Sequence, residues 1–381
     1  MKKIRILTVF GTRPEAIKMA PLLLGMRGRP ELEPLCCVTA QHREMLDTVL
    51  DIFGIRPDFD LNIMQPRQTL AAITTRVLEG LDEVMEQSKP DLVLVHGDTS
   101  TTFAAALTAF YHQIRVGHVE AGLRSHDKYS PYPEEMNRLL TSRIAELYFC
   151  PTLQNKMNLE AEGIRGGMYV TGNTVIDTVR LVARGDYLFK DTLLRSIDFN
   201  ARRVILLTAH RRENYGRPLE NIFLAVRDLC EKYPDIEVVY PVHPSPVVRE
   251  AAQAVLGGVA RVHLIEPLPV DDNLNLMSRC YLVLTDSGGI QEEAPALGKP
   301  VLVLRRETER PEAVAAGTAA LAGVEREAVF SMTERLLCDS EAYAGMARAV
   351  NPYGDGHASE RIIQAVLNNF GLAQRPADFT P

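Results

Sequence analysis

The sequence has no apolar stretch long enough to cross a bilayer as a helix, which takes about 20 predominantly apolar residues. Its first residues, Met1 to Leu7, begin like the charged start of a signal peptide. The polar run Gly11-Thr-Arg-Pro-Glu15 then follows and leaves no room for an apolar core. From these absences we expect no spanning helix and no secretory signal, and a cytoplasmic protein without membrane contact.

Positive charge is not in excess either. Lys and Arg number 42 against 49 Asp and Glu, a net charge of −7, so we expect no nucleic-acid surface. The six cysteines show no Cys-x-x-Cys spacing, and the nine histidines show neither His-x₃-His nor His-Glu-x-x-His. We therefore expect buried reduced thiols and no metal site. Internal repeats and low-complexity segments are also absent.

What the sequence does contain is an alternation of short apolar strands with helical patterns, over a length of 381 residues. One hydrophobic core rarely extends beyond about 250–300 residues, so two domains are expected. Apolar strands separated by helices are typical of parallel sheets covered on both faces. The strands are expected at 4–10, 35–39, 92–95, 116–119 and 147–150 in the first half, and at 204–208, 237–240, 262–265, 282–284 and 301–304 in the second.

Helices are expected between these strands. One shows the apolar spacing of an amphipathic helix, with Leu219, Ile222, Phe223, Val226 and Leu229 on one face. A helical tail at 358–370 is expected to return to the first domain. The sequence thus predicts an α/β protein of two doubly wound domains facing across a cleft, the first formed by residues 1–171 plus 358–381 and the second by 172–357. Further helices are expected at 14–24, 43–53, 69–87, 102–111 and 133–144.

Short polar signatures stand at the predicted ends of the strands. Ligands of open α/β sheets bind at the carboxyl ends of strands, so this placement indicates a functional site. A structural protein has little reason to collect carboxylates, imidazoles and guanidiniums there. The signatures are Gly11-Thr-Arg-Pro-Glu15, His96-Gly-Asp-Thr99, His118-Val-Glu-Ala-Gly-Leu-Arg124, Pro133-Glu-Glu-Met-Asn-Arg138, His210-Arg-Arg-Glu-Asn214 and Asp286-Ser-Gly-Gly289.

Two of these signatures can bind a phosphate. Ser287, Gly288 and Gly289 lie between a strand and a helix, where backbone N–H groups and the helix dipole favour an anion. An ordinary tight turn explains the same residues about as well. Arg13 can pair with a phosphate in bidentate fashion, or simply face solvent near a helix start. No Gly-x-Gly-x-x-Gly fingerprint opens the first unit, which argues against a tightly bound dinucleotide.

Three carboxylates form a second group. Asp98 and Glu120 follow neighbouring predicted strands, and Glu134 opens the next helix. Carboxylates placed close together shift one another's pKa, as general acid–base chemistry requires. The alternatives are helix capping and ion pairs with Arg124 or Arg138. The group as a whole, at strand ends, favours a reactive site.

Basic side chains follow the strands of the second half. His210 can be an acid, a base or a phosphate ligand, and Arg211 and Arg212 beside it favour an anion. His243 ends another strand in the same way. Arg305, Arg306 and Arg310 either add positive charge to the cleft or form a solvated loop. The residues themselves therefore indicate a two-domain α/β protein with an anionic, phosphorylated ligand and a carboxylate–histidine site.

At these residues the chain closely resembles the non-hydrolysing UDP-N-acetylglucosamine (UDP-GlcNAc) 2-epimerases of bacteria. The resemblance runs in order through nearly the whole chain. Besides the signatures above it includes Gly172-Asn-Thr174, Glu309-Arg-Pro-Glu312 and Asn351-Pro-Tyr-Gly-Asp-Gly356.

The resemblance implies a GT-B-like fold of two Rossmann-type domains and a homodimer that uses no cofactor and no metal. It implies reversible inversion of C2 between UDP-GlcNAc and UDP-ManNAc, by elimination of UDP to a bound 2-acetamidoglucal and re-addition. Catalysis is then carried by Asp98, Glu120, Glu134 and His210. UDP is held by Arg13, Ser287, Gly288, Gly289, Glu293 and Arg310.

Some members of this family are activated by substrate in a second pocket. The resemblance implies Gln41, Glu44, Arg67, Arg211 and His243 as candidates for it, although Glu44 departs from the glutamine of the family motif.

Three alternatives share these signatures. A hydrolysing relative would release UDP and free ManNAc, a GT-B glycosyltransferase would need an acceptor, and a UDP-sugar sensor would have lost the chemistry. The pair Glu120 and Glu134 favours the epimerase over the transferase, and the intact set of Asp98, Glu120, Glu134 and His210 argues against the sensor.

Overall fold

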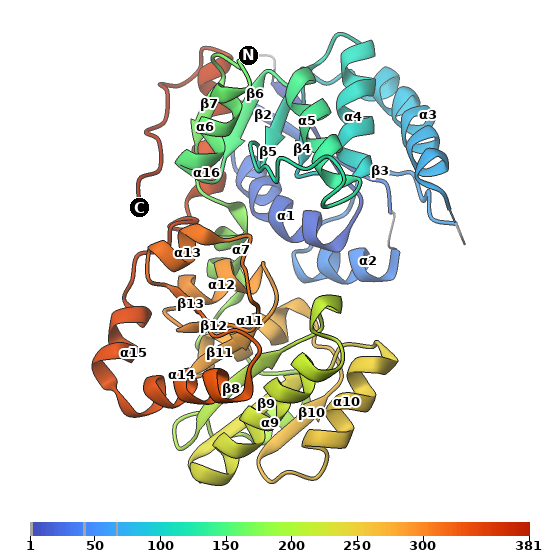
Figure 1. The fold of residues 1–381 in the computed structure, drawn as a ribbon. Coiled ribbons are helices and arrows are strands. Elements are labelled where there is room, and N and C mark those ends of the chain that lie inside the picture. Colours follow the sequence, from blue (N-terminus) through green and yellow to red (C-terminus); the bar gives the residue numbers. More distant parts are fainter. Residues whose placement is uncertain (1–2, 41–42, 66–67) are drawn as a thin grey trace. The chain divides into compact units, whose positions relative to one another are not determined.

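The computed structural model describes residues 3–40, 43–65 and 68–381, which form two compact units (Figure 1). Unit 1 comprises Met1–Thr178 and Tyr353–Thr380, and unit 2 comprises Val179–Pro352 with the last residue, Pro381. The C-terminal segment therefore belongs to the same unit as the N-terminus.

Unit 1 is built on a seven-stranded sheet of order β3-β2-β1-β4-β5-β6-β7. Each neighbouring pair is parallel. The strands are β1 (Ile4–Phe10), β2 (Leu32–Val38), β3 (Phe59–Asp60), β4 (Leu92–His96), β5 (Arg115–Val119), β6 (Leu147–Cys150) and β7 (Met168–Val170).

Unit 2 repeats the plan with a six-stranded sheet of order β10-β9-β8-β11-β12-β13, also parallel throughout. Its strands are β8 (Arg203–Thr208), β9 (Ile236–Pro241), β10 (Val262–Ile265), β11 (Leu282–Thr285), β12 (Val301–Val303) and β13 (Ala319–Leu321). The prediction of two doubly wound parallel sheets is confirmed.

Helices cover both faces of each sheet. In unit 1, α3 and α4 pack on the face that contains Leu7 and Val9, while α16 packs against α1. The helices of unit 1 are α1 (Arg13–Arg27), α2 (Arg43–Ile52), α3 (Leu70–Ser88), α4 (Ser100–Tyr111), α5 (Glu134–Ile144), α6 (Leu153–Ala161) and α16 (Ala358–Asn369). The boundary of the two units falls within α7 (Thr174–Val182).

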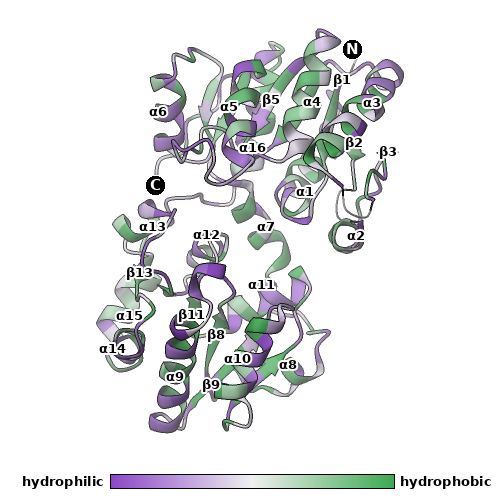
Figure 2. Cartoon of the chain, turned by 45° about the vertical axis from the view of Figure 1, so that its right-hand side comes forward, coloured by the Kyte–Doolittle hydropathy of each residue, from purple (hydrophilic) through white to green (hydrophobic). Residues whose placement is uncertain are grey.

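The amphipathic pattern expected from Leu219 to Leu229 lies on α9 (Figure 2). Its five expected core residues, from Leu219 to Leu229, are all at most 1% exposed. Burying each such side chain contributes roughly 1.5–3 kcal/mol. The other helices are α8 (Thr192–Ser196), α9 (Arg217–Lys232), α10 (Pro246–Leu256), α11 (Val270–Arg279), α12 (Ile290–Ala296), α13 (Pro311–Ala315), α14 (Arg326–Cys338) and α15 (Ser340–Ala347), with a 3₁₀ turn at Arg212–Asn214.

Three strands were not expected from the sequence: β3, β7 and β13. They have only two or three residues each, so hydrophobic periodicity has too few positions to reveal them, and all three lie at sheet edges. Five of the six cysteines are buried and all are free, whereas Cys338 is exposed rather than buried as expected. Within the described ranges, no helix combines the length and apolarity needed to span a membrane.

The strand order reverses once in each sheet, and this positions the site. In unit 1 the chain moves outward from β1 through β2 to β3 and then returns to β4 on the other side of β1. In unit 2 it moves from β8 through β9 to β10 and returns to β11. The two strands on either side of the reversal are β1 and β4 in unit 1, and β8 and β11 in unit 2. The loops that follow such a pair of strands diverge to opposite faces of the sheet and leave a crevice between them, where open α/β sheets bind ligands.

Candidate active site

A buried carboxylate ties together the two loops at the reversal point of unit 1. Glu15 is 3% exposed. Its Oε2 accepts hydrogen bonds from the backbone N–H groups of Gly11 (3.0 Å) and Thr12 (2.8 Å) after β1. Its Oε1 accepts from the hydroxyls of Thr99 (2.7 Å) and Thr102 (3.2 Å) after β4. Burial raises the pKa of Glu15, and these hydrogen bonds counteract the rise.

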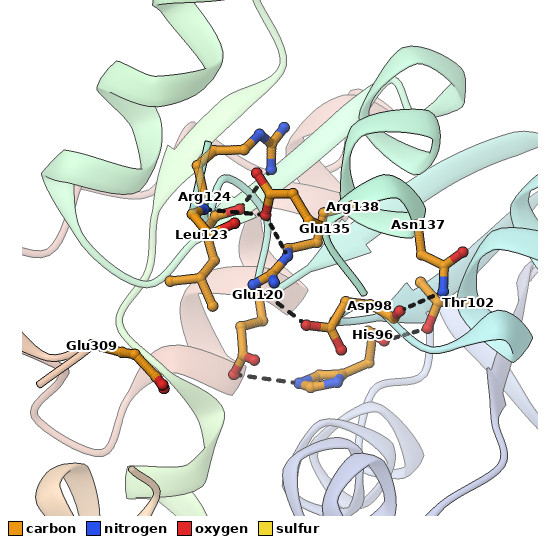
Figure 3. A network of polar contacts seen from close by, with 12 residues as sticks. His96, Asp98, Thr102, Glu120, Leu123, Arg124, Glu135, Asn137, Arg138 and Glu309 are labelled. Carbon is orange, nitrogen blue, oxygen red and sulfur yellow. Dashed lines mark hydrogen bonds and ion pairs between the residues drawn. The ribbon is translucent and has the colours of Figure 1, made fainter. Parts of the chain in front are cut away.

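The predicted carboxylates Asp98 and Glu120 lie together because β4 and β5 are paired. His96, the last residue of β4, is in register with Val119, so the loops after both strands begin at the same level. Figure 3 shows Glu120, Asp98 and His96 converging from these strand ends. Glu120 itself has the left-handed backbone angle φ 62°, which costs a non-glycine residue about 1–3 kcal/mol. Such strain is typical of functional sites.

Glu120 lies among three side chains. Its Oε2 forms an ion pair with the Lys18 ammonium of α1 and accepts a hydrogen bond from Asn173 Nδ2 at 2.9 Å. The same oxygen is 3.7 Å from Nε2 of the buried His96. The negative charge of Glu120 is therefore compensated and its carboxylate is held in one place.

Asp98 has a different environment. Its carboxylate is 3.5 Å from Arg138 Nη1, and its backbone carbonyl accepts a hydrogen bond from Asn137 Nδ2 at 2.9 Å. Burial raises the pKa of Asp98 to about 6, with Arg138 opposing the rise and the charges of Glu120 and Glu134 adding to it. Glu134 is the first residue of α5, as predicted, and its Oε2 is buried with no hydrogen bond from the described residues. The structure brings all three predicted carboxylates into one electrostatic group.

Two histidines beside the carboxylates are kept neutral. Burial lowers the pKa of His96 to about 3 and that of His118 to about 4. His118 Nε2 is 2.7 Å from the carbonyl oxygen of Gly97, while neither ring nitrogen of His96 has a hydrogen-bond partner in the described part of the chain. At neutral pH both imidazoles are thus uncharged.

Sequence reasoning missed Lys18, His96 and Asn173 as members of this group. His96 gave a signal, since it ends an apolar strand just as His210 does. Lys18 gave none, because it is 102 residues from Glu120 in the chain. Asn173 is 53 residues away, and its signal was its place in the Gly172-Asn-Thr174 signature of the resemblance. Of the two arginines considered as partners, Arg138 pairs with Asp98 and also with Glu135 (3.2 Å), whereas Arg124 pairs with Glu162 (2.6 Å).

Unit 2 has its own buried carboxylate at the reversal point. Asp286, directly after β11, is 0% exposed. Its Oδ2 accepts hydrogen bonds from the backbone N–H groups of His210 (2.7 Å) and Arg211 (2.8 Å) and from Asn214 Nδ2 (3.1 Å), all in the loop after β8. His210 stacks in parallel on His243, with 5.1 Å between ring centroids. This carboxylate fixes the predicted histidine.

The predicted phosphate-binding turn follows Asp286. Gly289 caps α12, and a Cβ placed there would be 3.6 Å from Glu293 Oε1. The Ser287 N–H is donated to Thr285 Oγ1 at 2.9 Å, so its hydroxyl is the group better placed for a ligand. Arg310 forms an ion pair with Glu292, which is buried. Ser287, Gly288, Gly289, Glu293 and Arg310 thus lie on adjoining segments of one unit.

The remaining candidate residues are placed as follows. Arg13 is exposed at the first position of α1. Gln41 and Arg67 lie outside the described residues, as does the side chain of Glu44. Arg211 and His243 stand on the loops around His210, where His243 Nδ1 accepts a hydrogen bond from the Ser245 N–H at 3.1 Å. A substrate-activation pocket formed by these five residues stays a prediction.

The fold and the site together define a class of protein. Two doubly wound parallel sheets of seven and six strands, each with polar loops at its reversal point, make up a GT-B-like two-domain fold.

A model of the family described as UDP-N-acetylglucosamine 2-epimerase matches residues 25–367. The chain is 56% identical to the UDP-N-acetylglucosamine 2-epimerase of Bacillus subtilis (strain 168), with 100% of both chains covered. It is also similar to the S. aureus MnaA–UDP co-structure (TM-score 0.89, 49% identity, 99% of this chain and 100% of that one). A third match is the Neisseria meningitidis UDP-GlcNAc 2-epimerase bound to UDP-GlcNAc (TM-score 0.85, 50% identity, 96% and 100% covered). The chain therefore belongs to the UDP-N-acetylglucosamine 2-epimerase family of enzymes.

The raised pKa of Asp98 predicts a pH-dependent effect on stability. In the unfolded chain this carboxyl ionises near its ordinary pKa of 3.8, but in the folded protein only near 6. Between these values the unfolded state binds fewer protons, so stability is lost as the pH rises through this window. In Asp98→Asn that loss is absent. We expect its free energy of unfolding, relative to wild type, to increase between pH 4 and pH 7.5.

Urea unfolding at the two pH values measures this difference. The exposed carboxylate Asp51 provides the control, because Asp51→Asn should give the same difference from wild type at both. An Asp98→Asn effect that does not change with pH would contradict the buried, proton-binding state of Asp98.

Proposed function

We propose that this protein interconverts UDP-GlcNAc and UDP-ManNAc by inverting C2, through elimination of UDP and its re-addition to a bound 2-acetamidoglucal. The observation that carries the proposal is the carboxylate group of unit 1. Glu120 and Glu134 are close enough to Asp98 to raise its pKa. Asp98 follows β4 at the reversal point, Glu120 follows the paired strand β5, and Glu134 begins the next helix. Membership of the family and the nucleotide sugar named for the N. meningitidis relative support the substrate.

The chemistry explains why carboxylates are needed. The C2 proton of the sugar is not acidified by an adjacent carbonyl group, so its removal alone is very slow. In an elimination, the bond from C1 to the phosphate oxygen breaks with its electron pair going to UDP, and C2 gives its proton to a base. In the re-addition an acid returns a proton to the opposite face of C2 and the phosphate oxygen bonds to C1 again. Acid and base groups at both faces are therefore required.

The two carboxylates with cationic partners suit these roles. Glu120 is held by Lys18 and Asn173, and Asp98 by Arg138. A pKa of about 6 lets Asp98 exchange a proton near neutral pH without a large energetic cost. Their negative charges also stabilise the positive character that C1 acquires as the phosphate leaves. Glu134, whose Oε2 has no hydrogen bond from the described residues, is the third candidate for proton transfer.

We further propose that unit 2 binds the UDP group. The Gly289 cap of α12, the Ser287 hydroxyl and the guanidinium of Arg310 offer donors to phosphate, and Glu293 offers an acceptor to ribose hydroxyls. Arg13, exposed at the start of α1, is assigned to the same ligand. Donors that hold the departing phosphate lower the barrier to breaking its bond to C1. The UDP named in the S. aureus co-structure supports this assignment.

Deuterium incorporation tests the reaction directly. Purified protein with UDP-GlcNAc in D₂O and no acceptor should give UDP-ManNAc with deuterium at C2, as observed by proton NMR. Free ManNAc and UDP as main products would indicate the hydrolysing reaction instead. Unchanged substrate would favour a transferase or a sensor. Detection of 2-acetamidoglucal by mass spectrometry after rapid quenching tests the intermediate.

Removing one carboxylate should stop this exchange. We expect Glu120→Gln and Asp98→Asn each to lower kcat by about 10²- to 10⁴-fold, the usual contribution of a positioned acid or base. Binding of UDP, measured by calorimetry, should persist. Glu83→Gln changes an exposed carboxylate of the same unit and is the matched control. Turnover near wild type in both site variants would refute the assigned roles.

The assignment of Arg310 predicts a loss of nucleotide affinity. Arg310→Lys keeps the charge beside Glu292 but removes the planar fork that pairs with phosphate. We expect UDP to bind about 10- to 100-fold more weakly by calorimetry, the equivalent of one charged hydrogen bond. Arg306 lies in the same loop with its side chain 75% exposed, so Arg306→Lys should bind UDP like wild type. Equal affinities for all three proteins would exclude Arg310 from the UDP site.

We also propose a homodimer. Large apolar side chains are exposed on α4, where Phe110 and Tyr111 are 60% and 66% exposed, and on the adjoining α5, where Leu140 is 39% exposed. Patches of this kind are typical of protein interfaces. Sedimentation equilibrium should give twice the chain mass of 42.4 kDa, and Tyr111→Asp should shift the mass toward that of one chain. A monomer in the wild type would contradict the proposal.

A further inference from the structure

The two oxygens of the buried Asp286 carboxylate have different surroundings. Oδ2 accepts three hydrogen bonds, from the His210 and Arg211 backbone N–H groups and from Asn214 Nδ2, which leaves it no capacity for another donor. Oδ1 is buried and accepts no hydrogen bond from the described residues. The polar atom that faces it is His210 Nδ1, at 3.3 Å.

This arrangement bears on which ring nitrogen of His210 carries the proton. A neutral imidazole has one N–H donor and one acceptor nitrogen. A lone pair on Nδ1 would face the negative charge of Oδ1, whereas an N–H at Nδ1 gives that buried oxygen a donor. The N–H is therefore favoured at Nδ1, and Nε2 is left with the lone pair. The ring plane is also fixed, since His210 and His243 stack at an interplanar angle of 6°.

We propose that Asp286 is a positioning residue for His210, holding the proton on Nδ1 so that Nε2 is presented as the unprotonated nitrogen. The inference rests on the proposed function, in which His210 takes part in the chemistry. A proton taken up from solvent at Nε2 then leaves Nδ1–H on the carboxylate, and the imidazolium forms beside a buried negative charge that stabilises it. Nothing else needs to move for the ring to gain or lose that proton.

The other charged groups that face His210 act against protonation. Burial lowers the pKa of His210, and His243 and Arg211 lower it further, while Asp286 raises it. Asp286 is thus the group that keeps the ring able to accept a proton. Removing its charge is expected to move the titration of His210 to lower pH.

The substitution Asp286→Asn gives a distinctive outcome. The three N–H donors at the Oδ2 position require an oxygen there, so the amide NH₂ of asparagine is placed at the Oδ1 position, facing Nδ1. A donor at that position favours the lone pair on Nδ1 and shifts the proton to Nε2. We expect the tautomer of His210 to reverse and turnover of UDP-GlcNAc to fall by about 10²- to 10⁴-fold, as when a histidine base is held in the wrong tautomer.

The measurement is ¹⁵N NMR of the full chain labelled at histidine, recorded from pH 5 to 8. The His210 signals are identified among the nine histidines by their loss in His210→Asn. In wild type, Nδ1 should be protonated and Nε2 should not. In Asp286→Asn the pattern should reverse and the titration should move to lower pH. An unprotonated Nδ1 in wild type, or an unchanged tautomer in the variant, would overturn the proposal.

Asn214→Ala is the matched control. It removes one of the three hydrogen bonds to Oδ2 and leaves Oδ1 in place, so we expect a less stable protein with the wild-type tautomer and titration. If this variant reversed the tautomer as well, the cause would be general loosening of the loop, and the proposal would be wrong. If Asp286→Asn did not fold, the wild-type spectrum would still decide. A wild-type protein with Nδ1 protonated but inactive on UDP-GlcNAc would refute the proposed function and leave the Asp286–His210 pair intact.

Discussion

The structure depends on one arrangement that occurs twice, a buried carboxylate that joins two loops where the strand order reverses. Glu15 accepts hydrogen bonds from backbone N–H groups of the loop after β1 and from hydroxyls of the residues after β4. Asp286 follows β11 and accepts hydrogen bonds from backbone N–H groups of the loop after β8. The two loops diverge to opposite faces of the sheet, so backbone pairing alone does not hold them together. A buried carboxylate that accepts hydrogen bonds from both loops does hold them together. Truncating its side chain would leave buried N–H groups without partners.

Asp98 lies after β4, beside one of these joined loops, and Glu120 follows the neighbouring strand β5. They stand next to two imidazoles that burial keeps neutral, and each has a cation at its side, Arg138 or Lys18. Buried charges without such partners would be protonated or would destabilise the fold. With them, the site has its charges in place before any ligand arrives. Fixed dipoles and charges of this kind stabilise developing charge without the cost of reorganisation.

Much of the architecture could be predicted because its causes are local. Apolar runs such as Ile4–Phe10 and Leu147–Cys150 coincide with β1 and β6, and the apolar spacing in α9 marks its buried face. The polar signatures could be assigned to a site because parallel strands bring their carboxyl ends to one edge. The strands β3, β7 and β13 could not be predicted, because two or three residues are held in a sheet by their neighbours rather than by their own pattern.

The sequence by itself determined the fold class, the family signatures and the identity of the candidate carboxylates and of His210, since these follow from residue types and short spacings. Only the tertiary structure decided their partners. Lys18 and Asn173 lie against Glu120 from 102 and 53 residues away, and Asp286 faces His210 from 76 residues away. Which carboxyl shares its proton near neutral pH, and which nitrogen of a histidine faces a buried charge, depend on burial and on atoms from distant segments. No short stretch of sequence contains the information for these two properties, because both arise when separate strands end at the same edge of a sheet.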